Sequence, residues 1–422
     1  MEQVEQLGQQ VNMPRSLRRP PAPAVNAGDF VPRLQTQLLV LQPTPFCNIN
    51  CSYCYLPQRD DRSRMSLATV RMAARRLRED SLLGSELTVV WHAGEPLMLP
   101  PSWYEQAFAV LADELSGVRL QQALQTNATL VDANWCALFK RHGVQVGVSV
   151  DGPAALHDLH RRTRRGGGTH AAVQRGMRLL RQHGVPFHAI AVVTAATLSG
   201  AGGGAGAVAG AGAGADNFYD WFAEQGITEL GCNFDEAEGA HAQSSLAGLD
   251  AAHETFMQRL LQRMLTGPVV VRELAAAWQL LRQPLPRWGW RGTHWPLNSQ
   301  AMPLALVTVL HNGDFGTFSP ELVGQPDAGR NNFVLGNVHG SGFLQALETP
   351  TFAGLWHDIQ SGIRSCQQHC QHFDHCGGGA PANKLYEHGD FGATETLHCR
   401  SMVKRPFDAM LRHAETAHGL AA

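Results

Sequence analysis

The sequence has no apolar stretch of the roughly 18 residues that a membrane-spanning helix needs. Its N-terminus, MEQVEQLGQQ, has neither a basic patch nor an apolar core, so a secretory signal is not expected either. Positive charge is not in excess, because 34 Lys and Arg stand against 36 Asp and Glu. Sequence-independent binding of nucleic acid needs a concentrated basic surface. We therefore expect a cytoplasmic protein without nucleic acid or membrane as partners.

Disulfides are not expected, although the chain has 9 cysteines. The number is odd and no secretory signal precedes them, which favours metal ligands or buried thiols. Of the 422 residues 44% are hydrophobic and 17% are charged, which is typical of a globular chain of one large or two ordinary domains.

Short apolar runs alternate with helical patterns up to about residue 236. The runs occupy 37–44, 86–92, 120–127, 144–152, 186–194 and 229–235. Helical patterns cover 67–77, 103–115, 132–143 and 172–184, with Gly143 and Gly184 as C-terminal stops. Strands that alternate with helices of this length indicate βα units around a parallel sheet. The predicted fold class is α/β, with a partial (β/α)6 TIM-like barrel.

Unusual residues follow the predicted strands. They fall in the segments 47–54, 92–95, 125–127, 149–151 and 233–238. In a βα barrel the loops after the strands meet on one face, so we expect these segments to form one site.

The remaining chain suggests further domains. We expect a flexible tail over 1–35, the barrel over 36–240, a helical bridge over 241–299, a small cysteine-rich domain over 300–402, and a C-terminal helix or tail over 403–422. Helical patterns in the bridge cover 251–265 and 269–281. The glycine-rich stretch 199–215 lacks the Lys-Ser/Thr ending of a phosphate-binding loop, so we interpret it as a flexible loop.

The first cysteine motif is PFCNINCSYCY, with Cys47, Cys51 and Cys54 spaced C-x3-C-x2-C. Three thiolates on one loop can hold a [4Fe-4S] cluster by three irons and leave the fourth iron open to a ligand. Zinc held by three cysteines and a distant histidine is the alternative, but a structural zinc ribbon would usually show a second cysteine pair nearby. The motif therefore favours an iron–sulfur cluster.

This motif after a first strand resembles that of the radical S-adenosylmethionine (SAM) superfamily. WHAGEP resembles the superfamily's glycine-glycine-glutamate motif, with Ala93 in place of the first glycine, and QTNATL, SVDGP and HDLHR resemble motifs that line the SAM pocket. The resemblance implies SAM as a cofactor and a [4Fe-4S] cluster on the three cysteines. The residues it places at SAM are Tyr53, Gly94, Glu95, Gln125, Asn127, Ser149 and Arg161.

A second cysteine motif reads C-x3-C-x5-C-x22-C over Cys366, Cys370, Cys376 and Cys399. Its spacing alone allows an iron–sulfur cluster or zinc. The segment resembles the SPASM domain, which in full form holds two auxiliary [4Fe-4S] clusters. Ala380 stands where that domain has a further cysteine, so the resemblance implies one auxiliary [4Fe-4S] cluster, either as an electron acceptor or as a structural element.

Together the motifs look like those of the cyclophane-forming peptide maturases, the GrrM/OscB or XYE type. The resemblance implies a ribosomally made precursor peptide as substrate and an electron donor such as flavodoxin or ferredoxin. Asp235, Glu236 and Glu321 are the predicted acids that take up the proton lost from the aromatic ring, although a solvated acidic loop is an equal interpretation of the first two. The alternatives are formylglycine-forming sulfatase maturation and a non-catalytic metal-binding scaffold.

Overall fold

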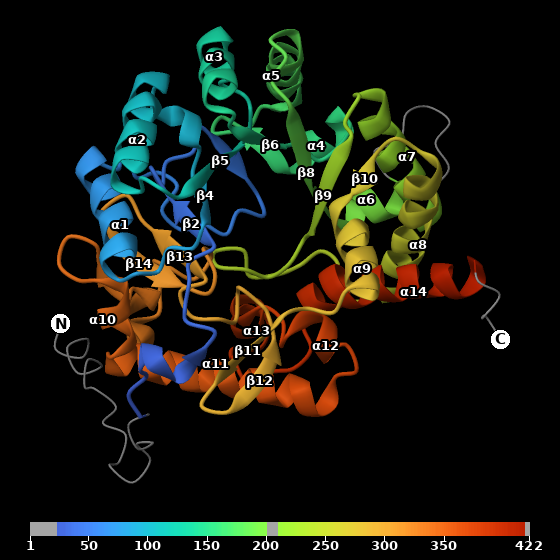
Figure 1. Ribbon diagram of the computed structural model, residues 1–422. Helices are drawn as coiled ribbons and strands as arrows, with labels where there is room; N and C mark the ends of the chain where they lie inside the picture. Colours follow the sequence, from blue (N-terminus) through green and yellow to red (C-terminus); the bar gives the residue numbers. More distant parts are fainter. Residues whose placement is uncertain (1–22, 201–209, 418–422) are drawn as a thin grey trace, which may run out of the picture.

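The computed structural model describes residues 23–200 and 210–417 (Figure 1). The predicted strands are present as β2 (Leu38–Leu41), β4 (Glu86–Trp91), β5 (Arg119–Thr126), β6 (Gln145–Ser149), β8 (Phe187–Val193) and β9 (Glu229–Phe234). All pair in parallel, in the order β2-β4-β5-β6-β8-β9. Such strands are covered on both faces, and β2 accordingly reads as the continuous apolar run LLVL.

Further strands extend this sheet at both edges. β10 (Val270–Val271) pairs in parallel with β9, and β13 (Leu306–Val309) pairs in parallel with β2. Antiparallel strands β14 (Asp314–Thr317) and β15 (Gly336–Asn337) follow β13. The sheet begins at β10 and ends at β15, so it is open, which confirms the predicted α/β fold class and partial barrel.

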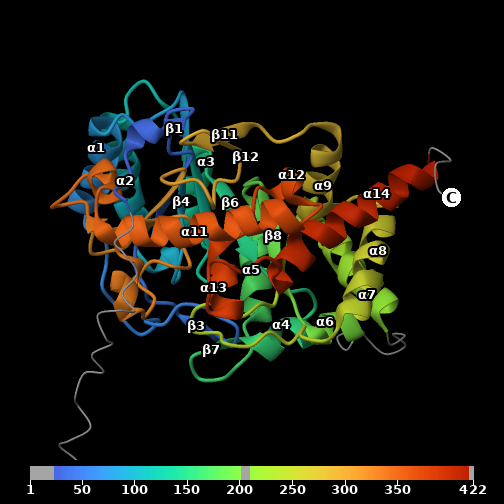
Figure 2. The same cartoon turned by 90° about the horizontal axis from the view of Figure 1, so that it is seen from below.

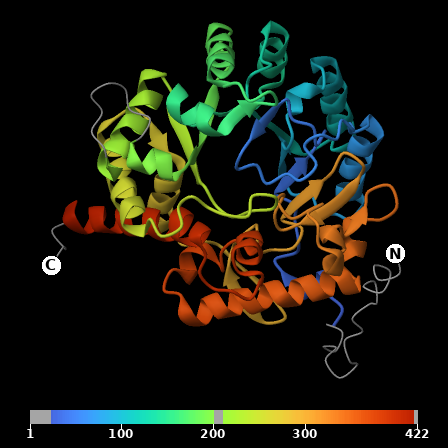
Figure 3. The ribbon, with the colours of Figure 1, turned by 180° about the vertical axis from the view of Figure 1, so that it is seen from behind.

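Helices cover the outer face of the arched sheet (Figures 1 and 3). They are α1 (Leu67–Glu79), α2 (Pro101–Glu114), α3 (Ala133–His142), α5 (His170–Gln182), α7 (Ala211–Glu224) and α8 (Asp250–Thr266), with α4 (Ala154–His160) and α6 (Ala195–Ser199) as short additions. Asp132 caps α3 by accepting from the Trp135 backbone N–H. The stops at Gly143 and Gly184 are confirmed, because both adopt positive φ, 59° and 66°.

The C-terminal segment lies across the open side of the arch (Figures 2 and 3). It contains α10 (Phe343–Leu347), α11 (Pro350–His369), α12 (Phe373–Cys376), α13 (Pro381–His388), η5 (Cys399–Lys404) and α14 (Arg405–Ala417). A small antiparallel sheet of β1 (Phe30–Val31), β11 (Arg287–Trp290) and β12 (Thr293–Pro296) packs on it. Trp288 packs edge-on against Trp295 and at a tilt against Trp356 there, with ring centroids 5.1 and 6.0 Å away.

Two expectations differ from the structure or fall outside it. The helix expected over 269–281 is wrong at its start: Val270–Val271 form β10 and α9 covers Arg272–Arg282, because β-branched valines favour extended backbone. The glycine-rich stretch lies outside the described residues over 201–209, and Ala211 begins α7. The expected tail likewise lies outside them up to residue 22.

The expected domain boundaries stay a prediction. The main sheet continues past residue 300, because β13 pairs with β2. None of the helices in the described ranges is long and apolar enough to span a membrane.

Candidate functional site

The N-terminal cysteine group, Cys47, Cys51 and Cys54, lies in the loop that follows β2. Ile49–Cys51 form β3, which pairs with β7 (Arg161–Thr163) so that Cys51 is opposite Arg161. Burial raises the pKa of Cys47 to about 12 and that of Cys51 to about 11, and the charge on Cys54 adds to both. These thiols hold their protons at neutral pH, so a metal centre has to displace them.

Glu95 joins two of the strand-end loops. Its Oε1 accepts from the Leu97 backbone N–H at 3.0 Å and from Thr126 Oγ1 at 2.6 Å, and its Oε2 accepts from the Asn127 backbone N–H at 2.8 Å. The carboxylate caps η3 (Pro96–Met98). Glu95 therefore holds the loops after β4 and β5 in one arrangement.

The residues before Glu95 form a tight turn against the cysteine loop. Gly94 has φ +57°, and a Cβ there would meet the Thr44 carbonyl and lie 2.6 Å from Phe46 O. Ala93, where the related motif has glycine, also has a positive φ of 69°. An alanine pays a steric cost in this conformation, so the turn is strained at that position.

Glu95 is 1% exposed, and burial raises its pKa from 4.5 to about 7 against the effect of its three donors. Because the folded pKa is the higher one, this group's stabilisation is complete below pH 4.5 and is lost as the pH rises through 7. We expect Glu95→Gln to remove a slope of about 1.4 kcal/mol per pH unit from the unfolding free energy within that window. Denaturant unfolding without SAM measures it, with exposed Glu224→Gln as control; an unchanged slope contradicts the assignment.

Asn127 connects the loop after β5 to the cysteine loop. Its Nδ2 donates to Asn48 Oδ1 at 2.9 Å and lies 3.8 Å from Cys47 Sγ. Gln125 Nε2 donates to Ser149 Oγ at 2.8 Å, and Gly147 leaves the space for it. The predicted SAM residues of β5 and β6 therefore lie side by side.

Arg161 forms a buried ion pair with Asp151. Its Nε and Nη2 donate to Asp151 Oδ2 and Oδ1 at 2.9 and 3.0 Å, and Tyr53 OH also donates to Oδ2. Burial alone would raise the pKa of Asp151, but Arg161, together with His157 and Tyr53, offsets this and the pKa is lowered. Sequence analysis missed Asp151 as a positioning residue; the charge pattern SVDG followed by HDLHR was the available signal.

Carboxylates form the opposite wall. Asp235 is held by His241 Nε2 and the Ser245 backbone N–H, both at 2.8 Å. Glu236 Oε2 accepts from His398 Nδ1 at 2.7 Å and from Asn383 Nδ2 at 2.9 Å, which ties β9 to the C-terminal segment.

Two further acids on this wall, Glu238 and Glu321, have raised pKa values. Burial raises the pKa of Glu238, and the nearby Glu321 charge raises it further. Burial also raises the pKa of Glu321, although Ser319 Oγ donates to its carboxylate. Because the Glu321 charge raises the pKa of Glu238, protonation of one group favours the ionised, proton-accepting form of the other.

The N-terminal cysteine group and the predicted SAM-pocket residues and acids line one space of about 440 Å³, which we call the central cavity. Its lining includes the N-terminal cysteine group and every predicted SAM-pocket residue and acid: Tyr53, Gly94, Glu95, Gln125, Asn127, Ser149, Arg161, Asp235, Glu236 and Glu321. The prediction that the strand-end loops form one site is therefore confirmed as a matter of position. The role of each residue stays a prediction.

His92 and Tyr55 also line the cavity. Burial lowers the pKa of His92 to about 4, and its Nε2 lies 3.5 Å from Tyr55 OH. His92 is therefore neutral at physiological pH.

The C-terminal cysteine group, Cys366, Cys370, Cys376 and Cys399, is gathered from α11, α12 and η5. Burial is the largest cause of the raised pKa of Cys376, and the charges of Cys366 and Cys370 raise it further, so these residues lie close together. The pKa of Cys399 is likewise raised first by burial and then by the charge of Cys376. Asn298 Nδ2 donates to the carbonyls of Cys376 and Gly379, both at 2.9 Å, which holds the glycine turn between α12 and α13.

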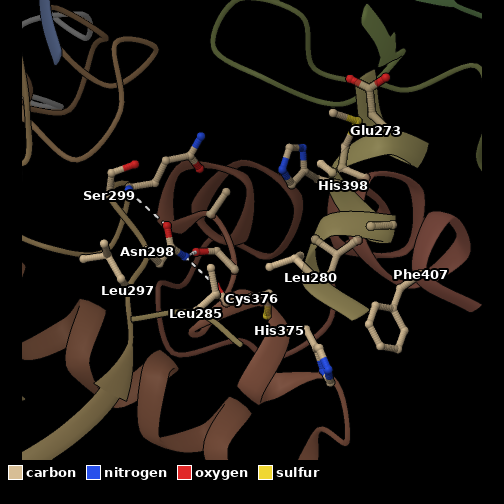
Figure 4. A pocket seen from close by; sticks show the side chains of 17 residues that line it. Glu273, Leu280, Leu285, Leu297, Asn298, Ser299, His375, Cys376, His398 and Phe407 are labelled. Carbon is tan, nitrogen blue, oxygen red and sulfur yellow. Dashed lines mark hydrogen bonds between the residues drawn. The ribbon is translucent and has the colours of Figure 1, made fainter. Parts of the chain in front are cut away.

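A second cavity of about 290 Å³ adjoins Cys376 (Figure 4). Asn298 and Cys376 line one side, and Leu280 and Phe407 lie across from them. His398 also borders it, so the His398–Glu236 hydrogen bond stands between the two cavities.

Both cysteine groups fit iron–sulfur clusters. In residues 23–200 and 210–417 no three His, Cys, Asp or Glu side chains converge on a point that would hold a single metal ion. A four-iron cluster takes each thiolate on a separate iron, so it needs thiols around a volume and not around a point. Three thiols bordering a cavity, and four thiols within electrostatic reach of one another, meet that requirement.

The open parallel barrel with a cysteine loop after its first strand defines an α/β protein whose chemistry sits at the strand ends. The sequence profile of the radical SAM superfamily matches residues 41–198. Protein sll1766 of Synechocystis is 34% identical over 397 residues, which cover 92% of this chain and 94% of that protein. The chain belongs to the radical SAM superfamily, and as a member it uses SAM and iron–sulfur chemistry.

Other similarities are partial or concern the fold. The serine-type anaerobic sulfatase-maturating enzyme of Klebsiella aerogenes is 41% identical over 152 residues, 35% of this chain and 38% of that enzyme. The solved structure of anSMEcpe with bound AdoMet and Cp18Cys peptide has a TM-score of 0.70 at 19% identity, covering 92% of this chain and all of that one. SuiB of Streptococcus suis bound to precursor peptide SuiA has a TM-score of 0.56 at 15% identity, covering 87% and 76%.

Proposed function

We propose that this radical SAM enzyme is a peptide maturase that joins an aromatic ring carbon to the β-carbon of a nearby residue in a ribosomally made precursor peptide, forming a cyclophane. The observation that carries the proposal is the central cavity, which is lined both by the N-terminal cysteine group and by the partly buried acids Glu238 and Glu321. Forming a C–C bond between two C–H positions removes two hydrogens from the peptide. The cavity offers a radical source and a proton acceptor in the same space.

The N-terminal cysteine group would hold a [4Fe-4S] cluster, and the SAM-pocket residues would hold SAM beside it. When bound, these cofactors supply an electron to SAM and a 5′-deoxyadenosyl radical that removes one hydrogen atom from the substrate. The protein contributes position and a dry cavity. Gln125, Asn127 and Ser149, which hydrogen bonds hold in place, would line the SAM pocket, and the turn at Gly94 lies against the cysteine loop.

The second hydrogen leaves the ring as a proton and an electron, which go to different acceptors. Glu321, which shares its environment with Glu238, takes the proton from the ring carbon as the ring regains aromaticity. Asp235 and Glu236 already accept two hydrogen bonds each and are better suited to shape the wall. The C-terminal cysteine group would hold one auxiliary [4Fe-4S] cluster, which can supply an acceptor for the electron.

The relatives support a peptide substrate. The names of the sulfatase-maturating enzyme and of SuiB with precursor peptide SuiA describe proteins that act on or bind polypeptides. An electron donor such as flavodoxin or ferredoxin would reduce the first cluster. Formylglycine formation is the second candidate, because the serine-type sulfatase-maturating enzyme is 41% identical to this chain over 152 residues.

Co-expression under low oxygen with each short open reading frame beside the gene tests the proposal. We expect one peptide to lose two hydrogens, with tandem mass spectra that lack fragments between an aromatic residue and the residue two positions along. Cys54→Ala serves as the inactive control, and Cys136→Ala, changed inside α3, as the matched cysteine control.

Formylglycine formation also removes two hydrogens, so mass alone does not separate the candidates. An aldehyde reacts with hydroxylamine, and the modified peptide still gives a complete series of fragments. A cross-linked peptide does not react with hydroxylamine, and it lacks the fragments between the two joined residues. A hydroxylamine-reactive product would replace the cyclophane proposal by the second candidate. SAM cleavage without any altered peptide would reject both substrates.

A further inference from the structure

Lys384 is a buried lysine that contacts one cysteine of the C-terminal group. It lies on α13 and is 2% exposed. Its Nζ donates to Cys366 Sγ at 3.2 Å and to Gly362 O at 3.1 Å. Gly362 and Cys366 are one turn apart on α11, and a Cβ at Gly362 would lie 3.0 Å from Nζ. The glycine therefore leaves the space in which the ammonium reaches the sulfur.

The ammonium has no carboxylate partner in the described part of the chain, where no Asp or Glu oxygen forms an ion pair with Lys384 Nζ. A buried charge without a counter-charge is strongly unfavourable, and proteins pair or neutralise it. Among the contacts of Lys384, the group that becomes negatively charged on binding a cluster is Cys366.

The surroundings of Cys366 Sγ also indicate that a positively charged donor is needed at this position. Cys366 is buried, and its Sγ lies 3.7 Å from Gly378 O and 3.5 Å from Thr394 O. A thiol can donate to a carbonyl oxygen, but a thiolate cannot and is repelled by it. A thiolate at this position therefore needs a donor with positive charge, and Lys384 is placed to be that donor.

We propose that Lys384 is a positioning residue that donates to the Cys366 ligand of the auxiliary cluster and raises the reduction potential of that cluster. The inference rests on the proposed assignment of this cluster to the C-terminal cysteine group. Reduction adds negative charge, and a nearby buried cation stabilises the reduced state more than the oxidised one. Lys384 thus makes the cluster a better acceptor of an electron leaving the central cavity.

Lys404 provides a matched contrast. It lies within electrostatic reach of Cys370 and Cys399, but its Nζ donates to Glu395 and its side chain is 23% exposed. The carboxylate cancels most of its charge and solvent screens the rest. Removing Lys404 should therefore change the potential far less than removing Lys384.

The test uses the full chain with Cys47, Cys51 and Cys54 all changed to alanine, so that only the auxiliary cluster remains. Lys384→Met, Lys384→Arg and Lys404→Met are compared in this background. Iron and sulfide content, together with an anaerobic redox titration followed by electron paramagnetic resonance, give occupancy and potential. At a fixed solution potential we expect the reduced-to-oxidised ratio to fall about tenfold in Lys384→Met, which is 59 mV for one electron. The ratios of the other two variants should stay within about twofold.

Each outcome bears on the inference. Loss of the cluster in Lys384→Met, with retention in Lys384→Arg, supports the charge as the requirement. An unchanged potential at full occupancy in Lys384→Met overturns the inference, and so does equal cluster loss in both Lys384 variants, which would indicate packing. Absence of iron in the background protein with Lys384 intact overturns the cluster assignment itself.

Discussion

Cys54→Ala is expected to stop SAM cleavage, with a loss of at least about 10³-fold, because the cofactors carry the chemistry and the protein cannot replace it. Cys54 borders the central cavity together with Cys47 and Cys51. With two thiolates left, the cluster loses one of its three protein ligands. Release of 5′-deoxyadenosine after reduction, measured by chromatography alongside iron content, gives the result.

Cys136→Ala is the matched control for this prediction. Cys136 is fully buried in α3 and lies away from both cysteine groups in the sequence. Its replacement should cost roughly 1 kcal/mol of stability and leave the iron content as it was. Equal SAM cleavage by Cys54→Ala and Cys136→Ala would reject the N-terminal cysteine group as the cluster site.

Arg161→Met is expected to destabilise the fold by about 3–5 kcal/mol, because it leaves Asp151 buried without its cation. Asp151 is 2% exposed, and its carboxylate also accepts from the Val192 backbone N–H at 2.9 Å. The ion pair thus joins the ends of β6 and β8 to β7. β7 in turn pairs with β3 of the cysteine loop. Denaturant unfolding under anaerobic conditions measures the change.

The control for Arg161 is Arg119→Met, which removes an exposed ion pair with Glu86 whose side chains are 71% and 53% exposed. That change should stay below about 1 kcal/mol. The double variant Asp151→Asn with Arg161→Met should recover part of the lost stability, since no buried charge is then left alone. If Arg161→Met and Arg119→Met cost the same, the pair does not organise the loops.

The sequence predicted the parallel strands and the helices between them because each has a regular pattern several residues long. It did not predict β10, β1 or β15, which are only two residues each and have no measurable period. The pairing of β13 with β2 joins residues more than 260 positions apart. Such pairing depends on how the chain closes and leaves no local signal.

The residues of the site also divide into those that the sequence predicts and those that it does not. The N-terminal cysteine group, Glu95 and Arg161 stand in recognisable motifs, and the structure places them all at one cavity. The partners Asp151 and Lys384 could not be assigned, because their importance lies in what burial does to a charge. Burial and counter-charge are set by packing between distant segments, which a single sequence does not reveal.

The hydrogen bonds at Glu236 have a consequence for how such enzymes diversify. One carboxylate oxygen receives both Asn383 of α13 and His398, the neighbour of Cys399. A substitution of Glu236 that adapts the cavity to another substrate would therefore also remove hydrogen bonds next to the C-terminal cysteine group. Conversely, a C-terminal region taken from a relative would need an acid at the end of β9 to bond with. We therefore expect the barrel and the C-terminal region to change together at this contact.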